Sequence, residues 1–364
     1  MIHRPRKKIV TRRNLFYFIQ FCILVFGVSF PFWQTAEIFN IYHPLWIIVP
    51  GVIFVLFFVL AFGTFFELPE PVLKFFKKII GYWLGGGFIL FVVMVCLSSV
   101  HFFIPIPRDI IFSSGLVIST ILIIYSYHHA QHIFIHSFSV ESSKITKKYT
   151  FVQLSDIHIG SNGEKEVERI LEKIADIHYD FVVITGDLVD EDYATYKDLK
   201  PLSRITTPIY YITGNHEYYL RHTSFKQFIN KTDITDINDK KVSFGELDIY
   251  GIDEKSDAEK ILTKLNVNND RYAIGLMHEP HTPEMQKSER QGIDMMLCGH
   301  THNGQIFPFT WMVQARYKFI KGFYTLGNMS IHVSQGTSTW GPKMRLGTSN
   351  EITIIDLIPK EKDF

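Results

Sequence analysis

The sequence predicts a membrane domain of about four transmembrane helices over residues 1–140, followed by an α/β domain over residues 141–364. Residues 15–127 are dominated by Phe, Ile, Leu and Val, whereas the second part has the mixed polar composition of a soluble globular domain. In that second part, short β-branched runs alternate with segments of helical period, a pattern typical of layered α/β folds. We therefore expect an α/β domain attached to a membrane.

Four apolar runs in the first part are long enough to cross a bilayer, since about 18 or more apolar residues with few charges indicate a transmembrane helix. They are Leu15–Trp33, Pro44–Phe66, Tyr82–Ile104 and Ile110–Tyr127. None has a charged residue at its centre, which argues against an ion path, a proton relay or a transporter. The first run could instead be a cleaved signal peptide, but it is longer than a typical signal core and no small-residue cleavage site follows it.

The orientation follows from the Lys and Arg residues of the short loops. The N-terminal tail, the loop after the second run and the segment after the fourth carry twelve of them, against Arg108 alone in the other two loops. Cytoplasmic loops carry the excess of basic residues. We therefore expect a multi-pass protein of the inner or cell membrane whose N-terminus and second domain face the cytoplasm. The stretch Lys74–Lys78, which includes two Phe residues, is typical of an amphipathic interfacial piece.

The junction after the fourth run contains four histidines. On a helix, three of them would share one face and could hold a metal, but the alternation over Ile133–Val140 favours a strand. The four are His128, His129, His132 and His136.

The second part shows a series of strand-like runs. A helix is expected where Val167, Ile170, Leu171 and Ile174 form a stripe at i, i+3, i+4 and i+7, and Tyr193–Leu202 is also helix-like. The expected strands are Thr150–Leu154, Phe181–Thr185, Ile209–Thr213, Leu247–Ile252, Ala273–Met277 and Ile293–Cys298, with a strand-rich C-terminal part in Tyr324–Ser334 and Ile352–Leu357.

Five of these runs end in polar clusters. Ligands of open α/β sheets bind at the carboxyl ends of strands, so we expect the clusters to converge on one crevice. Any single histidine among them would more often be a core or loop residue, but core histidines would not gather at consecutive strand ends. The residues are Asp156, His158, Asp187, Asn215, His216, His278, His300 and His302.

These residue types suit a pair of metal ions. Carboxylate, carboxamide and imidazole groups bind Mn, Fe or Zn. Two ions about 3.5–4 Å apart can stabilise both the attacking and the leaving oxygen of a phosphate ester. Such a pair needs one bridging carboxylate and about three further ligands per ion, and the residues present match that need. Glycines before Asp187, Asn215 and His300 let the chain turn sharply there.

The ordered blocks resemble the calcineurin-like metallophosphoesterase family. They are Asp156-x-His158, Gly186-Asp187, Gly214-Asn215-His216-Glu217, His278 and Gly299-His300-x-His302. The resemblance covers about residues 149–357. It includes a stretch typical of the membrane-associated bacterial branch, namely Gly336-Thr337, Pro342, Arg345-Leu346 and Glu351-Ile352. It implies a four-layer α/β/β/α sandwich and a metal-dependent hydrolase of phosphoric esters or pyrophosphates.

The resemblance also implies roles for the residues. Asp156, His158 and His302 would hold one divalent ion, Asn215, His278 and His300 the other, and Asp187 would bridge them, with Mn as the first choice and Fe or Zn as alternatives. His216 would contact the phosphate as a general acid or electrostatic stabiliser. Glu217 would orient His216 or cap the following helix.

The loop after the last ligand differs from the family pattern. Asn303 stands where many relatives have Gly, which leaves the substrate contacts near this loop open, and Thr301 and Gln305 could line the pocket. We read His222, His281 and His332, which lack motif support, as loop or structural residues.

The membrane domain favours a lipid-linked phosphorylated substrate among membrane lipids, because it would hold the site near the cytosolic leaflet. The resemblance points to UDP-2,3-diacylglucosamine of lipid A biosynthesis, cleaved to UMP and a lipid phosphate. The alternatives are a broad-specificity phosphatase or phosphodiesterase acting on other phospholipids, nucleotides or phosphoproteins, and a non-catalytic scaffold. A net charge of +1 and no basic stripe near the motifs argue against a nucleic-acid partner. The oligomeric state is open.

Overall fold

The computed structural model describes residues 32–33, 35–36, 41, 43–62, 68–220 and 229–360. Contacts divide the chain into two compact units: Met1–Tyr127 with Gly341–Lys343, and His128–Trp340 with Met344–Phe364. The second unit begins before the boundary expected at residue 140. The reason is that Ile133–Ser142 forms a strand, β1, that pairs along its whole length with the last strand of the second unit.

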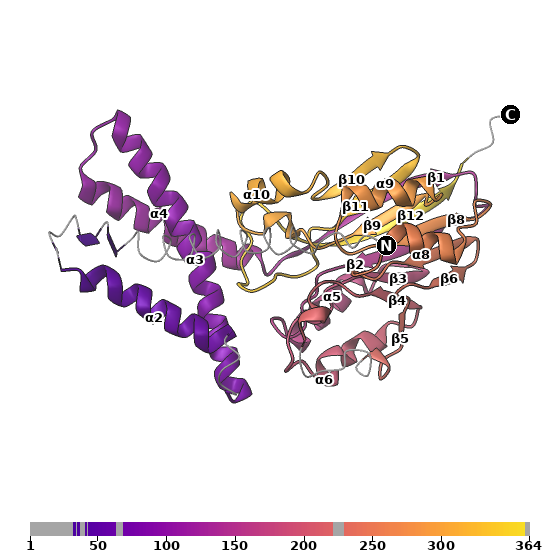
Figure 1. The fold of residues 1–364 in the computed structure, drawn as a ribbon, viewed down its shortest axis with the longest axis horizontal. Coiled ribbons are helices and arrows are strands. Elements are labelled where there is room, and N and C mark those ends of the chain that lie inside the picture. The colour runs from indigo at the N-terminus through magenta and orange to yellow at the C-terminus, as the bar shows by residue number, and fades with distance from the viewer. Residues whose placement is uncertain are drawn as a thin grey trace, which may run out of the picture. The chain divides into compact units, whose positions relative to one another are not determined.

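The described part of the first unit is helical (Figure 1). Helix α2 spans Leu45–Phe62, α3 spans Glu70–Phe103 and α4 spans Arg108–His129. Among the described residues, α3 and α4 are long and apolar enough to cross a membrane, by length and composition. Helix α3 begins before the expected run, so the basic stretch Lys74–Lys78 lies in its first turns.

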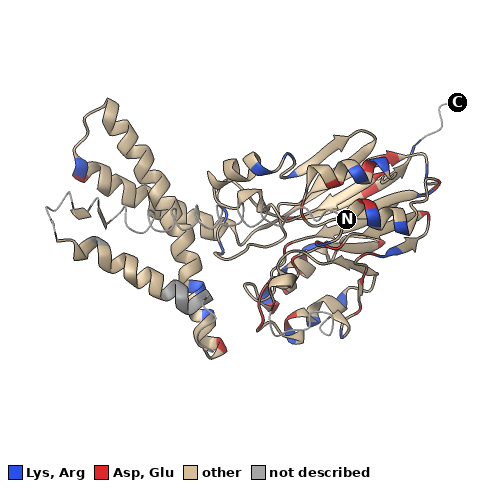
Figure 2. Ribbon diagram, viewed as in Figure 1, with Lys and Arg blue, Asp and Glu red and all other residues tan. Residues whose placement is uncertain are grey.

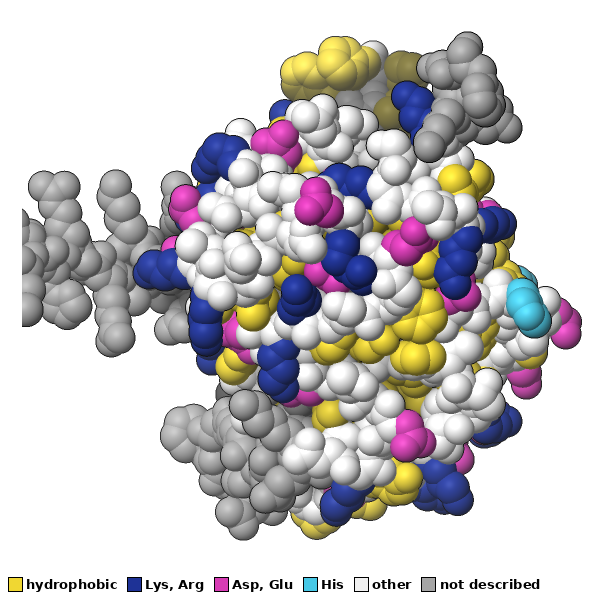
Figure 3. Space-filling model, turned by 90° about the vertical axis from the view of Figure 1, so that its right-hand side faces the viewer, with side chains coloured by type: hydrophobic (Ala, Val, Ile, Leu, Met, Phe, Trp, Pro, Cys, Tyr) yellow, Lys and Arg dark blue, Asp and Glu magenta, His cyan; other side chains and the backbone are white. Residues whose placement is uncertain are grey.

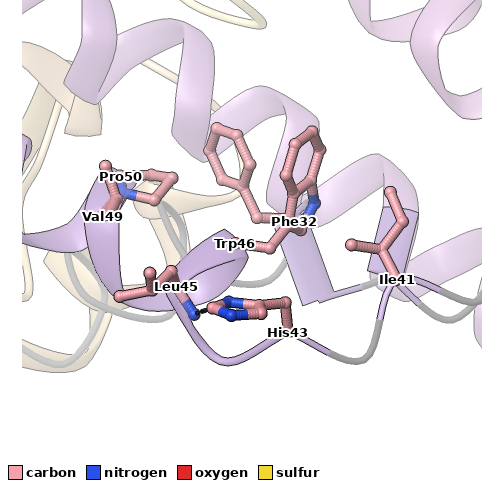
Figure 4. A pocket seen from close by; sticks show the side chains of 7 residues that line it. All are labelled: Phe32, Ile41, His43, Leu45, Trp46, Val49 and Pro50. Carbon is pink, nitrogen blue, oxygen red and sulfur yellow. Dashed lines mark hydrogen bonds between the residues drawn. The ribbon is translucent and has the colours of Figure 1, made fainter.

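The expected four-helix membrane domain is described only in part. Most of the first run, Leu15–Trp33, lies outside the described residues, so the four-helix arrangement stays a prediction. A hollow of about 400 Å³ lies at the start of α2 (Figure 4). Apart from His43 its lining is apolar, which suits packing rather than chemistry. The lining residues are Phe32, Ile41, His43, Leu45, Trp46, Val49 and Pro50.

The second unit contains two mixed six-stranded sheets (Figure 1). The first has the order β1, β12 (Asn350–Pro359), β2 (Tyr149–Leu154), β3 (Phe181–Thr185), β4 (Ile209–Ile212) and β5 (Ile234–Asp236). The second has the order β10 (Gly322–Leu326), β11 (Met329–Val333), β9 (Met295–Cys298), β8 (Tyr272–Leu276), β7 (Leu247–Gly251) and β6 (Lys241–Phe244).

Parallel pairing dominates the centre of each sheet. Strands β2, β3, β4 and β5 are parallel, while β12 joins β2 in the antiparallel direction. Strands β7, β8, β9 and β11 are parallel, with antiparallel β6 and β10 at the two edges. Because parallel strands run the same way, their carboxyl ends meet at one edge of each sheet. Every strand expected from the sequence is present, and β5 and β6 are additional.

Helices α5 (Glu164–Ile174), α6 (Tyr196–Leu199), α8 (Ala258–Leu265) and α9 (Thr282–Arg290) cover the outer faces. Helix α10 (Phe309–Arg316) has no buried residue and packs beside the 3₁₀ helix η3 (His302–Gly304). Two further short 3₁₀ helices are η1 (Lys200–Arg204) and η2 (Glu217–Tyr219). The helix expected over Tyr193–Leu202 is shorter, because the chain tightens into η1 at Pro201.

Three apolar clusters show the layering. The middle cluster joins the two sheets face to face, with Phe151 and Phe181 of the first sheet stacked at 4.8 Å and Leu297 among their partners. The second joins the first sheet to α5 through Ile170. The third joins the second sheet to α8 and α9 and contains Met285. The second unit is therefore built as helices, sheet, sheet and helices, and its central strands are apolar on both faces.

Candidate metal centre

All eight predicted residues lie together at the carboxyl ends of strands. The first sheet contributes five of them: Asp156 and His158 after β2, Asp187 after β3, and Asn215 and His216 after β4. The second sheet contributes the other three: His278 after β8, and His300 and His302 after β9. The cluster thus lies where the ends of both sheets meet.

One group consists of Asp156, His158 and His302, whose ligand-capable atoms face one another. The Nε2 atoms of His158 and His302 are 3.0 Å apart. Asp156 Oδ1 is 3.3 Å from His302 Nε2 and 3.9 Å from His158 Nε2. All three residues are buried, so this group could bind an ion away from bulk water.

A second group consists of Asn215, His278 and His300. Asn215 Oδ1 lies 2.8 Å from His300 Nδ1 and 3.2 Å from His278 Nε2. The two imidazole nitrogens are 3.3 Å apart. These three atoms converge on one point, and His300 contributes its Nδ1 atom rather than Nε2.

Asp187 lies between the two groups. Its Oδ2 atom is 3.2 Å from His278 Nε2 and 3.9 Å from His158 Nε2. Its Oδ1 atom accepts the backbone N–H of His216 at 2.9 Å, which fixes the carboxylate. A single carboxylate therefore reaches both groups of ligands.

The residues fit divalent metal ions. Metal–ligand bonds of about 2.1 Å place neighbouring ligand atoms roughly 3.0–3.4 Å apart, and most separations within the two groups lie in that range. The imidazole nitrogens and carboxylate oxygens that face one another here are mostly hydrogen-bond acceptors, with too few donors among them. A bound cation would give all of these lone pairs a partner. The mixture of nitrogen and oxygen ligands suits Mn, Fe or Zn.

The backbone is unusual at these positions. Asp156, His158, Asp187, His300 and His302 all have positive φ angles, between 45° and 71°. Non-glycine residues rarely adopt this region, at a cost of order 1 kcal/mol or more each. Such strain persists only where the surroundings fix it, and here each residue lies within a few positions of the end of a buried strand. This local geometry explains why the ligands occur as short polar blocks after apolar runs.

Gly214 is required by close approach. A Cβ atom at this position would collide with the Asp187 carboxylate and lie 2.6 Å from the Asp187 backbone nitrogen. Only glycine lets the loop after β4 pass so close to the carboxylate that contacts both groups.

Electrostatics divides the histidines into two kinds. Burial lowers the pKa of His300 and of His302 to about 4, so both rings are neutral at pH 7 and offer lone pairs. Burial also opposes protonation of His278, but the Asp187 carboxylate outweighs it and raises the pKa of His278. Burial acts to raise the pKa of Asp187, while His278 and His216 hold it well below its usual range. Without a metal ion, the positive charge beside Asp187 is thus supplied by a proton on His278. Metal binding to His278 would release that proton.

Three of the histidines are held through their second ring nitrogen. His278 Nδ1 lies 2.7 Å from the backbone oxygen of Thr185, and His158 Nδ1 lies 3.4 Å from the buried carboxylate of Asp190. His300 Nε2 lies 3.2 Å from the Tyr317 hydroxyl, which in turn donates to Glu279. Partners of this kind orient a metal-binding ring and fix its tautomer.

The sequence analysis did not identify Asp190, Glu279 or Tyr317. For Asp190 a signal exists, since it is an acidic residue three positions after Asp187. Glu279 follows His278 directly but resembles an ordinary loop residue. Tyr317 has no sequence signal, because it reaches His300 only through the path of α10.

Arg345 supports His302 from the C-terminal segment. Its buried guanidinium donates to the backbone oxygens of His302, Gln335 and Ser338 and to the Asn350 side chain, each at 2.8 Å. Burial lowers the pKa of Arg345 to about 10, so it remains charged at neutral pH. One buried cation therefore ties the loop that holds His302 to the C-terminal segment.

Glu217 acts differently from the expected role. Its carboxylate accepts the backbone N–H groups of Gly214 at 2.8 Å and Val189 at 2.9 Å. It thereby joins the loops after β3 and β4 and neither orients the His216 ring nor caps a long helix. Burial and the nearby Asp187 raise the pKa of Glu217 to about 7.

The residues after His302 shape the entrance. Asn303 has φ of 50°, a region that Gly adopts freely and Asn tolerates. Thr301 donates its hydroxyl to the Ile320 backbone at 2.6 Å and so serves structure. The Gln305 side chain pairs with both the backbone N–H and the backbone oxygen of Trp340, at 3.0 and 2.9 Å.

His216 is surrounded by rings. The Trp340 and Tyr219 ring centres each lie 5.4 Å from the His216 ring, and that of His158 lies 4.8 Å away. Trp340 is 47% exposed and Tyr219 is 64% exposed. The His216 end of the cluster therefore opens between exposed aromatic side chains.

The remaining histidines lie apart from the cluster's centre. His281 pairs with Glu279 at 2.9 Å, and buried His332 contacts Gln153 at 2.7 Å. His222 lies outside the described residues. At the junction after α4, the strand β1 forms as the alternation predicted, rather than a helical face of histidines.

Comparison with known proteins agrees with this geometry. Residues 149–304 match the family model "Calcineurin-like phosphoesterase". An uncharacterized metallophosphoesterase of Campylobacter jejuni is 28% identical, over 93% of this chain and 97% of that protein. One from Helicobacter pylori is 34% identical, over 60% of this chain and 62% of that protein.

A relative from Danio rerio bears the name "Transmembrane protein with metallophosphoesterase domain". It is 30% identical over 57% of this chain, which spans about half of that protein (52%). Residues 149–304, which contain all of the converging ligand candidates, are thus similar to the calcineurin-like phosphoesterase family.

Proposed function

We propose that this chain is a membrane-anchored hydrolase of phosphoric esters that uses two divalent metal ions. The observation that carries the proposal is the presence of two groups of ligand atoms with the Asp187 carboxylate between them. Asp156, His158 and His302 would hold one ion, and Asn215, His278 and His300 the other. Such ions, Mn first and Fe or Zn otherwise, would polarise the phosphate and activate water.

His216 is the residue placed to act on the substrate. Burial lowers its pKa, so the ring is neutral at pH 7 and can donate one N–H. Its Nε2 atom lies 3.9 Å from Asp187 Oδ2, near both groups of ligands. We assign the neutral ring the role of a hydrogen-bond donor toward the phosphate or the leaving oxygen; as a general acid it would have to be protonated first.

The substrate that we favour is a lipid-linked phosphodiester or pyrophosphate. Two observations support it: the helices α3 and α4 have membrane-crossing length, and exposed aromatic residues border the site at His216. The lipid to assay first is UDP-2,3-diacylglucosamine, cleaved to UMP and a lipid phosphate. The second candidate is a broad-specificity phosphodiesterase, because the two-metal arrangement serves many phosphoric esters alike.

The test uses the full-length chain in detergent, stripped of metal and reloaded with Mn, Fe or Zn. Two products are measured in parallel. They are UMP released from UDP-2,3-diacylglucosamine, and nitrophenol released from a bis-nitrophenyl phosphate diester. UMP release supports the lipid-linked assignment, whereas diester cleavage alone supports broad specificity. If a metal-loaded sample hydrolyses neither, the chain is not the proposed hydrolase and a scaffold role gains weight.

A further inference from the structure

The segment that follows the metal centre carries an exposed apolar surface on α10. No residue of α10 is buried. Phe307, Trp311 and Met312 are 43%, 63% and 38% exposed, and the rings of Phe307 and Trp311 pack edge to face at 5.0 Å. Single exposed apolar residues are ordinary, but three within six positions form a patch, and such patches mark interaction sites. We call these three residues the α10 surface.

The α10 surface points away from the domain core. Thr310, on the same helix, donates its hydroxyl to the backbone oxygen of Asn303 at 2.9 Å and so marks the side that faces the protein. The flanking residues Trp311 and Met312 are left to the solvent side. A helix of two turns with this distribution presents its apolar residues outward rather than inward.

The segment that contains this surface carries basic but no acidic residues, although Arg316 of α10 pairs with Glu279 from the loop after β8. Residues 295–350 contain five Lys or Arg and no Asp or Glu, although the whole chain is balanced, with 37 basic and 36 acidic residues. Of these basic residues, Lys318 and Lys321 are exposed just after α10. Figure 2 shows basic but no acidic colouring along α10. The face drawn in Figure 3 differs, because both signs are mixed across it.

The same segment contacts the metal centre from two sides. Tyr317, directly after α10, reaches His300 Nε2 with its hydroxyl at 3.2 Å. Gln305, just before α10, holds the backbone of Trp340, whose ring lies against His216. Whatever binds the α10 surface would therefore lie beside the entrance to the site.

We propose that the α10 surface docks onto an anionic lipid bilayer. Trp311 and Met312 would enter the boundary between headgroups and acyl chains, where aromatic side chains are enriched. Lys318 and Lys321 would lie at the lipid phosphates, because basic residues beside an apolar helix face are attracted to anionic leaflets. Charge complementarity and the exposed Trp favour a bilayer over a second protein. The proposal stands independently of which ester the metal centre hydrolyses.

The experiment reconstitutes the full-length chain into phosphatidylcholine vesicles with or without phosphatidylglycerol. Lipids with brominated acyl chains quench Trp residues that reach the bilayer. The emission of Trp311 is obtained as the difference between the wild type and Trp311→Phe, so the other four Trp residues cancel. We expect brominated lipids to abolish most of this difference in vesicles that contain phosphatidylglycerol.

Two matched variants serve as controls. Trp311→Phe combined with Tyr196→Trp moves the reporter to α6, at a position 39% exposed in the protein, and its emission should escape quenching. Lys318→Gln with Lys321→Gln should reduce quenching at Trp311. Lys260→Gln with Lys264→Gln, exposed on α8, should leave it unchanged.

The outcomes are distinct. Trp311 emission that is equal in brominated and plain vesicles would overturn the proposal, as expected if another protein or another part of this chain covers the surface. Equal quenching of the reporter on α6 would overturn it as well, because insertion would then be unspecific. Quenching that is equal with and without phosphatidylglycerol, and equal in the wild type and the Lys318/Lys321 variant, would overturn the proposed attraction of these lysines to anionic lipid. Hydrolysis is not measured, so failure here is separate from failure of the proposed function.

Discussion

The residues that face the metal centre come from one span of the chain, whereas some of the residues that hold them come from another. The facing residues all lie within residues 149–304, the span that matches the phosphoesterase family. Two important supports, Tyr317 and Arg345, lie beyond that span, on the path through α10 and in the C-terminal segment. The ligand candidates thus lie within the span that matches the family model, whereas part of their support belongs to a segment outside it.

This difference has a physical origin. A ligand needs a rigid strand end and a sharp turn, and both are specified by a few consecutive residues. A supporting residue needs only to reach the ligand in space, so it can come from any part of the chain. We expect substitutions of ligands to abolish the chemistry and substitutions of supports to weaken it by degrees.

The largest effect is expected for Asp187→Asn. The amide keeps the shape but removes the negative charge that contacts both groups of ligands, so at least one metal ion should be lost. Activity should fall by more than the roughly 100-fold that loss of an outer partner costs. Metal content per chain, by elemental analysis, should fall together with the rate.

Asp270→Asn is the control, because Asp270 is exposed on a loop away from the cluster. It should keep both the metal content and the rate. Full metal occupancy in Asp187→Asn would show that this carboxylate does not bridge, and the two-ion arrangement would have to be redrawn.

The convergence of the ligand candidates was predictable because their signals are local. Asp156, Asp187 and His300 each follow an apolar run within a few positions, and strand ends in parallel sheets meet at one edge. The positive φ angles of these residues were not predictable, since they depend on the fixed strands around them. The roles of the ligands toward metal remain predictions that the substitutions test.

Other features could be seen only in the folded structure. The sequence predicted that Glu217 orients His216 or caps a helix. In the structure its carboxylate instead accepts hydrogen bonds from the backbone N–H groups of Gly214 and Val189. The pairing of β1 with β12 could not be predicted, because it is a contact across more than two hundred residues. Sequence periodicity reports a strand, but not the sheet that it joins.

Arg345→Met should have the next largest effect. It leaves the carbonyl oxygens of Gln335 and Ser338 buried without their Arg345 donor and removes one of the two donors to the His302 oxygen, and each buried group left unpaired costs about 1–3 kcal/mol. We expect a fall in unfolding free energy of about 3 kcal/mol or more, measured by denaturant unfolding, and weaker Mn binding. Arg345→Lys should recover only part, because one ammonium cannot reach four acceptors.

Arg290→Met serves as the comparison, since Arg290 is exposed on α9. It should change the free energy of unfolding by less than about 0.5 kcal/mol. A stable Arg345→Met protein with unchanged Mn affinity would remove the C-terminal segment from the account of the metal centre.

Tyr317→Phe should have a moderate effect on metal and little on the fold. It deletes the hydroxyl that lies between His300 Nε2 and Glu279, so the ring loses an orienting contact. Partners of this kind contribute about 10–100-fold to metal affinity, and we expect the Mn dissociation constant to rise by about 10-fold. Tyr196→Phe, on exposed α6, should leave it unchanged. If the Mn dissociation constant of Tyr317→Phe equals that of Tyr196→Phe, the Tyr317 hydroxyl does not orient His300.

Gln305→Ala should have the smallest effect, and it tests whether the entrance can be separated from the ligands. The substitution removes two hydrogen bonds to the Trp340 backbone, each with a net contribution of about 1 kcal/mol. The metal ligands themselves are untouched, so Mn content should stay at the wild-type level. Freed from Gln305, the Trp340 ring should pack less firmly against His216, so KM should rise by a few-fold while kcat changes less. A loss of Mn from this variant would show that the entrance and the ligands form one cooperative structure rather than two.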